Sequence, residues 1–381
     1  MSKLNDLINE LCPDGVEYKT IEEVFEIRNG YTPSKNKPEY WEHGTIPWFR
    51  MEDIRKNGRI LADSIQHITP SAIKGSGLFH ANSIIIATTA TIGEHALIIA
   101  DSLANQRFTN LKVRKSLSDK LLSKFVFYYM FVIDKWCKEN VNASSFASVD
   151  MKRFRQVEFP LPPLPIQEEI VRILDNFSEL EAELEAELDC RKRQYEFYRD
   201  KLLSFEDGSK VEWKKMSEIC KIMNGKDYKH LSEGQIPVYG SGGIMTYVDE
   251  YAYDKPSVLI PRKGSIGNLF YVEEPFWTVD TIYWTKIDDA TIFPKFFYYF
   301  MTTKDLTKLN MAAGVPSLTQ SMLYKIKIPI PSLSEQQRIV SILDRFEALS
   351  TDLQKGLPAE IAARRQQYEY YRDKLLTFKK K

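Results

Sequence analysis

The chain has 381 residues, 43% of them hydrophobic and 12% aromatic, enough to bury two cores of roughly 100 to 150 residues each. Its 52 basic and 52 acidic residues cancel, so the net charge does not mark a nucleic-acid binder. The sequence has neither a run of about 18 apolar residues nor an N-terminal apolar core, so we expect a cytoplasmic protein and not a membrane or secreted one.

The first half is expected to hold a short helical segment at 1–14 and a mixed α/β unit at 15–160, separated by the turn CPDG. Within the unit, the apolar stretches IPWF and SIIIAT predict strands, and LLSKFVFYYMF predicts a buried aromatic helix. The unit carries 20 basic and 16 acidic residues, a small positive excess that is weak evidence for binding DNA.

A long helix is predicted in the segment 161–207, because its apolar residues follow a heptad pattern after a proline-rich lead-in. It has 6 basic and 13 acidic residues, which offset the positive excess of the units on either side. We expect Leu180, Leu184 and Leu188 to lie in a helix–helix core. The seam residues are Ile166, Ile170, Ile173, Phe177, Leu180, Leu184, Leu188, Arg191, Tyr195, Tyr198, Leu202 and Phe205.

A second mixed α/β unit is expected at 208–331 and a second long helix at 332–381. SVLIPRKGSIG indicates a strand and turn, and FPKFFYYFM a buried helix. Ser334 and Gln337 resemble a capping box at the helix start, and Pro358 should interrupt the helix. We expect Tyr195, Tyr198, Tyr368 and Tyr371 to be core residues. Two rods of this length most simply pack on each other, which gives an α+β protein with two tandem units and two long coiled-coil helices.

The chain is an internal duplication. RKRQYEFYRDKLLSF at 191–205 returns as RRQQYEYYRDKLLTF at 364–378 with 11 identical positions, and PLPPLPIQEEIVRILDNF at 160–177 matches PIPSLSEQQRIVSILDRF at 329–346. The N-terminal VEYKTIEEV also echoes VEWKKMSEI at 211–219. A repeat of this size indicates tandem domains and not a solenoid, so the protein should touch two similar things at once.

No catalytic constellation is apparent, so we expect no catalytic residues, no metal site and no cofactor in this chain. PDGVEYK and its second copy EDGSKVEWK resemble a nuclease motif only superficially, because a glycine turn interrupts the elements. P-loop, HExxH and adenine-methyltransferase motifs are absent from the sequence. Cys12, Cys137, Cys190 and Cys220 lack CxxC spacing and are expected to be free thiols.

The ordered pair of units and helix motifs resembles the specificity subunit of type I DNA restriction-modification systems. NGYTPSKNKPEYW, IPWFRMEDI, ATTATIG and NQRF are similar to a first target-recognition domain of that family, and PRKGSIG, TVDTIYW and GVPSLT fill the matching places in the second. The resemblance implies that each domain reads half of an interrupted double-stranded DNA site, and that the two long coiled-coil helices lie antiparallel as a spacer between the domains. It also implies two modification (methyltransferase) subunits that carry S-adenosylmethionine, and two restriction subunits that use ATP and Mg.

Polar loop residues are the candidates for DNA contact, because amides and guanidinium groups read base edges while hydroxyls and lysines hold phosphate. In the first unit these are Tyr31, Thr32, Ser34, Lys35, Arg50, Thr88, Thr89, Thr91, Asn105, Gln106, Arg107, Ser144 and Ser148. In the second unit these are Lys226, Tyr239, Ser241, Arg262, Lys263, Ser265, Thr278, Thr281, Ser317 and Thr319. Arg199, Lys201, Arg372 and Lys374 are the candidates for contact with a modification subunit.

Two alternatives stay open on the sequence. A coiled-coil scaffold with two protein-binding heads would show the same periodicity, and an enzyme with an unrecognised site is disfavoured only by the missing motifs. An adenine methyltransferase in the neighbouring reading frame would favour the restriction-modification hypothesis.

Overall fold

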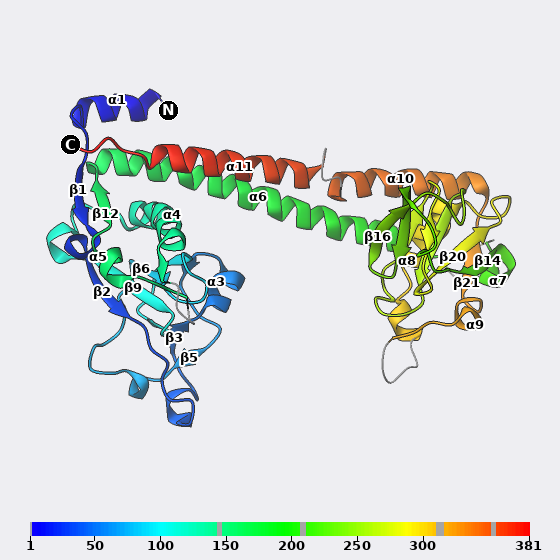
Figure 1. Cartoon of the computed structure of the whole chain (residues 1–381), viewed down its shortest axis with the longest axis horizontal. Helices are drawn as coiled ribbons and strands as arrows, with labels where there is room; N and C mark the ends of the chain where they lie inside the picture. Colours follow the sequence, from blue (N-terminus) through cyan, green and yellow to red (C-terminus); the bar gives the residue numbers. More distant parts are fainter. Residues whose placement is uncertain (1, 143–146, 206–210, 310–315, 352–355) are drawn as a thin grey trace. The chain divides into compact units, whose positions relative to one another are not determined.

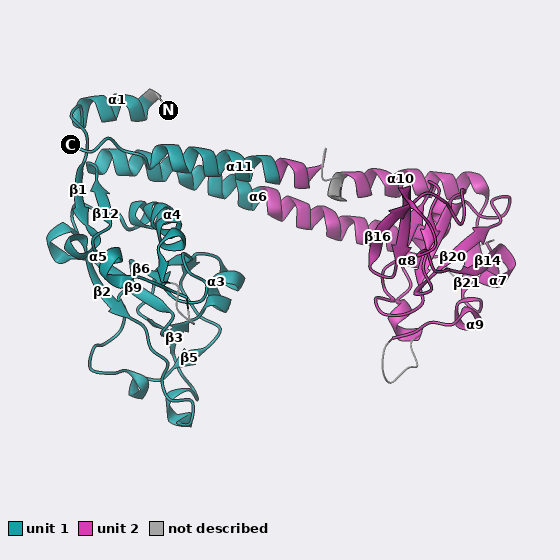
Figure 2. Ribbon diagram, viewed as in Figure 1, with its two compact units in different colours: residues 1–183, 362–381 teal, residues 184–361 magenta. Residues whose placement is uncertain are grey.

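A computed structural model describes residues 2–142, 147–205, 211–309, 316–351 and 356–381 (Figure 1). The chain divides into two compact units, of which unit 1 contains residues 1–183 and 362–381 and unit 2 contains residues 184–361 (Figure 2). Each unit combines a mixed α/β head with parts of the long helices, as the duplication and the aromatic helices predict. Within the described residues, no helix is both long and apolar enough to cross a membrane.

The head of unit 1 is built on a five-stranded sheet of order β2-β9-β6-β7-β4, in which only β4 and β7 run parallel. Its strands are β2 (Phe25–Asn29), β9 (Phe108–Val113), β6 (Ser83–Ala87), β7 (His95–Ile98) and β4 (Ile60–Leu61). A smaller sheet of order β5-β3-β8 consists of β5 (His67–Ile68), β3 (Ile46–Phe49) and β8 (Leu103–Ala104). The central strand β6 is buried throughout because both faces of the large sheet are covered.

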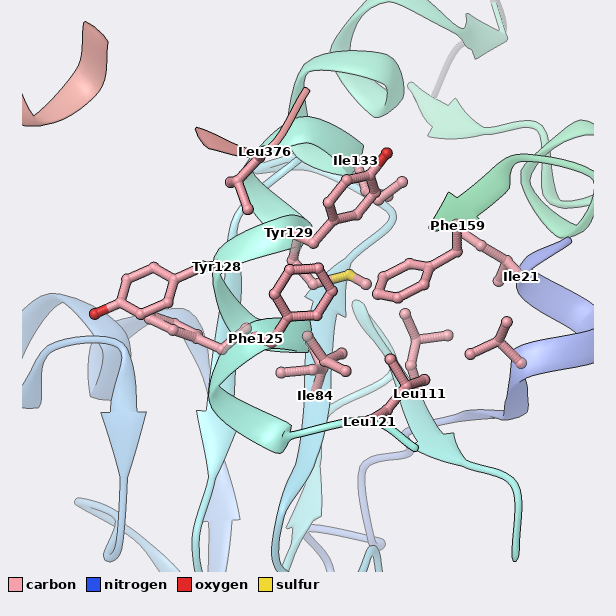
Figure 3. Packing of buried hydrophobic residues seen from close by; sticks show 14 of the residues in the cluster. Ile21, Ile84, Leu111, Leu121, Phe125, Tyr128, Tyr129, Ile133, Phe159 and Leu376 are labelled. Atoms are coloured by element: carbon pink, nitrogen blue, oxygen red, sulfur yellow. The ribbon is translucent and has the colours of Figure 1, made fainter. Parts of the chain in front are cut away.

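Alternate residues of β6 enter two different cores. Ile84 and Ile86 pack under helix α4 (Ser123–Glu139), whereas Ile85 and Ala87 face the core shared with the smaller sheet and α3 (Met51–Asn57). Figure 3 shows the α4 core, in which Phe125 and Tyr129 lie close to Phe159. The Tyr129 and Phe159 rings are 4.7 Å apart and meet edge on. The predicted aromatic helix is therefore core, as expected.

Short elements complete unit 1. They are α1 (Ser2–Leu11), β1 (Glu17–Thr20), α2 (Ile21–Val24), β10 (Val141–Asn142), β11 (Ser148–Val149), α5 (Met151–Arg155) and β12 (Glu158–Leu161), where β1 pairs with β12 and β10 with β11. The C-terminal tail also joins this unit, because Val16 accepts a backbone hydrogen bond from Lys381 and donates one to Lys379.

Unit 2 repeats the plan with fewer strands. Its larger sheet has the order β14-β20-β17-β18 and contains β14 (Cys220–Asn224), β20 (Ile282–Ile287), β17 (Ser257–Pro261) and β18 (Phe270–Val272). Its smaller sheet has the order β16-β15-β19 and contains β16 (Gly243–Val248), β15 (Glu233–Gly240) and β19 (Trp277–Thr278). The remaining elements are β13 (Glu212–Lys215), which pairs with β21 (Lys327–Ile330), α7 (Met216–Ile219), α8 (Pro294–Thr302) and α9 (Gln320–Leu323).

The long helices are α6 (Leu164–Leu203), α10 (Leu333–Thr351) and α11 (Leu357–Leu375). α6 passes from unit 1 into unit 2, while α10 lies in unit 2 and most of α11 in unit 1. α10 ends before Pro358 and α11 begins beside it, so the predicted interruption is confirmed. Leu180, Leu184 and Leu188, expected in a core, are only half-buried.

Two expectations about the helices are wrong. α10 starts at Leu333, so Ser334 lies inside it, and Ser332 accepts the capping hydrogen bond from Glu335 N instead. Tyr198 is 37% exposed. Its ring stacks on Phe346 with centroids 5.4 Å apart and meets Phe197 edge on, also at 5.4 Å. The equivalent Tyr371 stacks on Phe177 in unit 1 at 5.6 Å.

The start of α6 is fastened to its head by a buried glutamine. Gln167 accepts a hydrogen bond from Leu122 N (2.9 Å) and donates to Lys120 O and Pro162 O (both 2.7 Å). Gln336 on α10 does the same in unit 2, where it accepts from Phe293 N (2.7 Å) and donates to Thr291 O and Pro331 O. Both side chains are fully buried, so these bonds fix where each helix leaves its head.

A tyrosine–carboxylate contact is repeated beside each glutamine. Tyr128 on α4 donates to Asp175 (2.7 Å), and Tyr299 on α8 donates to Asp344 (2.5 Å). Burial, reinforced by these carboxylates, raises the pKa of both hydroxyls above the usual value. Both tyrosines therefore stay protonated donors, and Lys124 and Lys295 pair with the same two carboxylates.

Candidate nucleic-acid interface

Most of the candidate loop residues of unit 1 come together at one end of its two sheets. Backbone hydrogen bonds join the loops there: Thr88 N donates to Arg107 O (3.0 Å), and Val149 N donates to Thr88 O (2.9 Å). Tyr31 N donates to Ala104 O (2.9 Å). The segments 31–35, 49–50, 88–91, 104–107 and 148–149 therefore form one assembly, the loop cluster of unit 1.

Unit 2 has a loop cluster made by the same bonds. Arg262 N donates to Thr281 O (2.8 Å), Leu318 N to Arg262 O (2.9 Å), and Lys226 N to Thr278 O (2.8 Å). Its segments are 226, 239–245, 262–265, 278–281 and 317–319. Arg262 thus stands where unit 1 has Thr88, and Thr281 where it has Arg107. The two clusters share a backbone frame but present different side chains.

One turn of each cluster has the same strained backbone. Ala90 and Gly264 occupy equivalent positions and both have positive φ, 65° and 80° respectively. Next to them, Thr89 bridges to Ser148 in unit 1 and Lys263 bridges to Ser317 in unit 2, in both cases antiparallel. These bridges hold the turn open at the surface, where Lys263 and Ser265 are exposed.

The exposed polar side chains of unit 1 are partly organised by one another. Thr32 Oγ1 donates to Gln106 Oε1 (2.5 Å), and Asn105 Oδ1 accepts from Arg107 N (3.0 Å) in a local turn. The exposed candidates of this unit are Ser34, Lys35, Gln106 and Arg107, and the half-buried ones are Thr32, Arg50, Thr89, Thr91, Asn105 and Ser148.

In unit 2, Lys226, Lys263, Ser265 and Thr319 are exposed, and Tyr239, Ser241, Arg262, Thr281 and Ser317 are half-buried. The Arg262 guanidinium lies over the Tyr283 ring, 5.8 Å from its centroid, which orients the cation while leaving part of it in water. Its neighbour Lys263 is the more exposed of the two cations.

Three candidate DNA contacts are not supported. Thr88 is buried and its hydroxyl lies 3.1 Å from that of Thr109, and Thr278 is fully buried as the last residue of β19. Both are buried because they lie in or directly after strands that are covered on both faces. The Tyr31 hydroxyl is used internally, since it donates to Ala72 O and accepts from Lys74 N. Ser144 lies outside the described residues.

The repeated ends of α6 and α11 carry an exposed aromatic at the same motif position. Phe197 is 60% and Tyr370 61% exposed, and Lys201 and Lys374 lie over them at 5.9 Å in both copies. Neither aromatic was a candidate from the sequence, although each stands beside a tyrosine that packs between helices.

The cationic candidates on these helices differ in how exposed their side chains are. Arg372 is buried, because its guanidinium lies 4.5 Å from the Phe131 ring centroid and pairs with Asp373, so it is not available to a partner subunit. Arg199, its equivalent in unit 2, is half-buried, and Lys201 and Lys374 are exposed.

The remaining chemistry of the described chain offers no reactive centre. No group of three or more His, Cys, Asp or Glu side chains in the described ranges could hold a metal ion. All four cysteines are free, and burial raises the pKa of the Cys137 and Cys220 thiols to about 12, so these two stay protonated and unreactive.

Comparison with known proteins identifies close relatives. A family model described as the type I restriction modification DNA specificity domain matches residues 13–189 and 208–363. The chain is 43% identical over 384 residues to the type I restriction enzyme EcoprrI specificity subunit of Escherichia coli, covering 93% of each chain. It is 35% identical over 315 residues to the EcoR124I/EcoR124II specificity subunit of the same species, covering 71% of this chain and 74% of that one.

Solved structures agree in fold. The S subunit of a type I restriction-modification system from M. genitalium aligns with a TM-score of 0.51 at 18% identity, over 95% of this chain and 96% of that one. A chain solved in a study of complex assembly in the type I R-M system aligns with a TM-score of 0.64 at 17% identity, over 96% and 98%. At these identities the likeness concerns the fold alone, and it confirms the predicted α+β architecture.

Proposed function

This chain belongs to the family of type I restriction-modification DNA specificity subunits, and we propose that its two heads each read one half of an interrupted, asymmetric DNA site. The observation that carries the proposal is the pair of loop clusters, which share a hydrogen-bonded backbone frame and differ in side chains. Because the two loop clusters have the same backbone frame, we expect both heads to dock on the duplex in the same way. Unlike side chains predict unlike bases, because base edges in the major groove present distinct donor and acceptor patterns.

Within each cluster, we assign base contacts and phosphate contacts to different polar side chains. In unit 2, Arg262 is oriented by Tyr283 and is suited to read a guanine edge, whereas the exposed Lys263 is suited to hold phosphate. In unit 1 the matching positions hold threonines, and Gln106 and Arg107 provide the polar groups instead. The candidates that remain after the structural corrections are Thr32, Ser34, Lys35, Arg50, Thr89, Thr91, Asn105, Gln106, Arg107, Ser148, Lys226, Tyr239, Ser241, Arg262, Lys263, Ser265, Thr281, Ser317 and Thr319.

We propose that this chain recognises the DNA site and holds the complex together, and that partner subunits carry out the catalysis. We propose two methyltransferase subunits, which carry S-adenosylmethionine, and two restriction subunits, which use ATP and Mg. Two equivalent docking faces are supported by the paired aromatics Phe197 and Tyr370 with their lysines, because a duplicated exposed aromatic on otherwise polar helices is typical of a binding anchor.

Methylome sequencing of the host with and without this gene tests the proposal. We expect the gene to add adenine methylation at one motif with two unlike specified halves separated by unspecified bases. A symmetric, uninterrupted motif, or no gene-dependent motif in a strain whose methyltransferase gene is intact, would contradict it.

A further inference from the structure

One position in the loop clusters carries a cationic side chain in unit 1 and is covered by an apolar side chain in unit 2. In unit 1, Phe49 pairs with Ala104 in parallel and accepts a hydrogen bond from Asn105 N (3.0 Å). In unit 2, Tyr239 pairs with Thr278 in parallel and accepts from Val279 N (3.0 Å). Phe49 and Tyr239 are therefore equivalent, and so are the residues that follow them, Arg50 and Gly240.

Gly240 is not an empty position. A Cβ added there would lie 2.6 Å from the Met245 sulfur and 3.3 Å from its Cγ, so the Met245 side chain occupies the place of a side chain on residue 240. A register shift between Val238 and Tyr239 in the β15–β16 pairing makes this possible, because it brings Met245 of the neighbouring strand alongside the glycine. A side chain on residue 240 would require the flexible Met245 side chain to move aside.

Met245 faces solvent from this place. It is 57% exposed, and the adjacent Ile244 is 51% exposed. Both lie beyond the turn at Ser241, whose carbonyl accepts a hydrogen bond from Asn268 after the exposed turn 262–265. An apolar edge strand that is open to water usually has a partner. Its continuity with the loop cluster makes that partner the nucleic acid.

Arg50 stands at the position in unit 1 that is equivalent to Gly240, and its backbone is fixed by a hydrogen bond. Its backbone N–H donates to Asp53 (2.6 Å), and its guanidinium lies 5.8 Å from the Trp48 ring centroid. Its Nε is buried and has no hydrogen-bond partner in the described chain, and it lies 3.8 Å from the Glu52 carboxylate, within the range of an ion pair. The half-buried side chain is therefore oriented by Trp48 and Glu52 without a hydrogen bond from its Nε.

We propose that Arg50 and Met245 occupy equivalent readout positions and specify opposite base classes, Arg50 a guanine in one half-site and Met245 a thymine in the other. The inference rests on the proposed function. A guanidinium donates two hydrogen bonds to guanine O6 and N7, which thymine cannot accept in that geometry. A thioether offers no donor but makes an apolar contact with the thymine methyl group, and its flexibility adapts it to that small target.

Base analogues test both contacts in the complex of the full chain with its co-purified methyltransferase subunits. The DNA probes carry the methylated motif, with single guanines replaced by 7-deazaguanine, which lacks the N7 acceptor, or single thymines by deoxyuridine, which lacks the methyl group. We expect one 7-deazaguanine to weaken binding within the range of about 5- to 150-fold that a bidentate contact spans. One deoxyuridine in the other half-site should weaken binding about fourfold, the value of one buried methyl group.

The variants assign each effect to a residue. Arg50→Ala should lose the response to 7-deazaguanine and keep the response to deoxyuridine, and Met245→Gln should do the reverse. Met245→Leu should retain the deoxyuridine response because it keeps an apolar side chain of similar size. Lys56→Ala, which removes an exposed cation of α3 outside the loop cluster, should retain both responses.

The outcomes separate this inference from the proposed function. If the wild-type complex binds its motif but Arg50→Ala and Met245→Gln keep both analogue responses, the readout assignment is wrong and the function stands. If the wild-type complex shows no preference for its motif over unrelated DNA, the proposed function itself fails. Circular dichroism of each variant shows whether the fold is intact.

Discussion

The two units have the same frame and different surfaces. Gln167 and Gln336 make the same three backbone bonds, and Tyr128 and Tyr299 donate to equivalent aspartates. The loop clusters built on this frame instead replace Thr88 with Arg262 and Arg50 with a glycine covered by Met245. The comparison teaches that position is set by buried polar contacts at the helix starts, while the surface residues are free to change without moving the backbone.

The largest expected effect comes from breaking the frame in one unit. Gln336→Leu removes the partner of Phe293 N and of two carbonyls, so it should lower the free energy of unfolding of unit 2 by about 2 to 5 kcal/mol. Gln337→Leu, an exposed neighbour of the same type, should change it by less than about 0.5 kcal/mol. Urea unfolding measures both, and equal effects would show that the buried glutamine does not fasten the helix.

A smaller effect is expected from the surface of the same unit. Arg262→Ala should cost about 1 to 3 kcal/mol of binding and relax one base of the motif, because the guanidinium reads a guanine edge. Lys263→Ala should weaken binding to all sequences and lower the salt slope by about one unit, because it removes a phosphate contact. Binding titrations at several salt concentrations on matched and mismatched probes distinguish the two. Equal, sequence-independent losses would remove Arg262 from the readout residues.

The frame could be predicted from the sequence because it follows from periodicity and repetition. The heptad seam, the two aromatic helices and the proline in the first turn of α11 can each be recognised as a local sequence pattern. The same patterns say little about how deeply each residue is buried. Tyr198 occupies a seam position yet is 37% exposed, although its ring stacks on Phe346 of α10.

The loop clusters were predictable in composition and not in detail. Most of the polar loop residues named from the sequence lie in these clusters, but Thr88 and Thr278 are buried because both faces of β6 and β19 are covered. The place of Met245 depends on a register shift in β15–β16, and no local pattern specifies such a shift. Arg372 is buried against Phe131 of α4, a contact between residues more than 200 positions apart in the chain.

If the two heads read DNA independently on a shared frame, an exchange of one head should change only the half-site that it reads. Residues 15–160 are replaced by the first unit of a family member with a different DNA site, and the methylome of the resulting strain is sequenced. We expect a new first half-site beside an unchanged second half-site, with unspecified bases still between them. Changes in both halves, or a fully active protein with an unchanged motif, would contradict it.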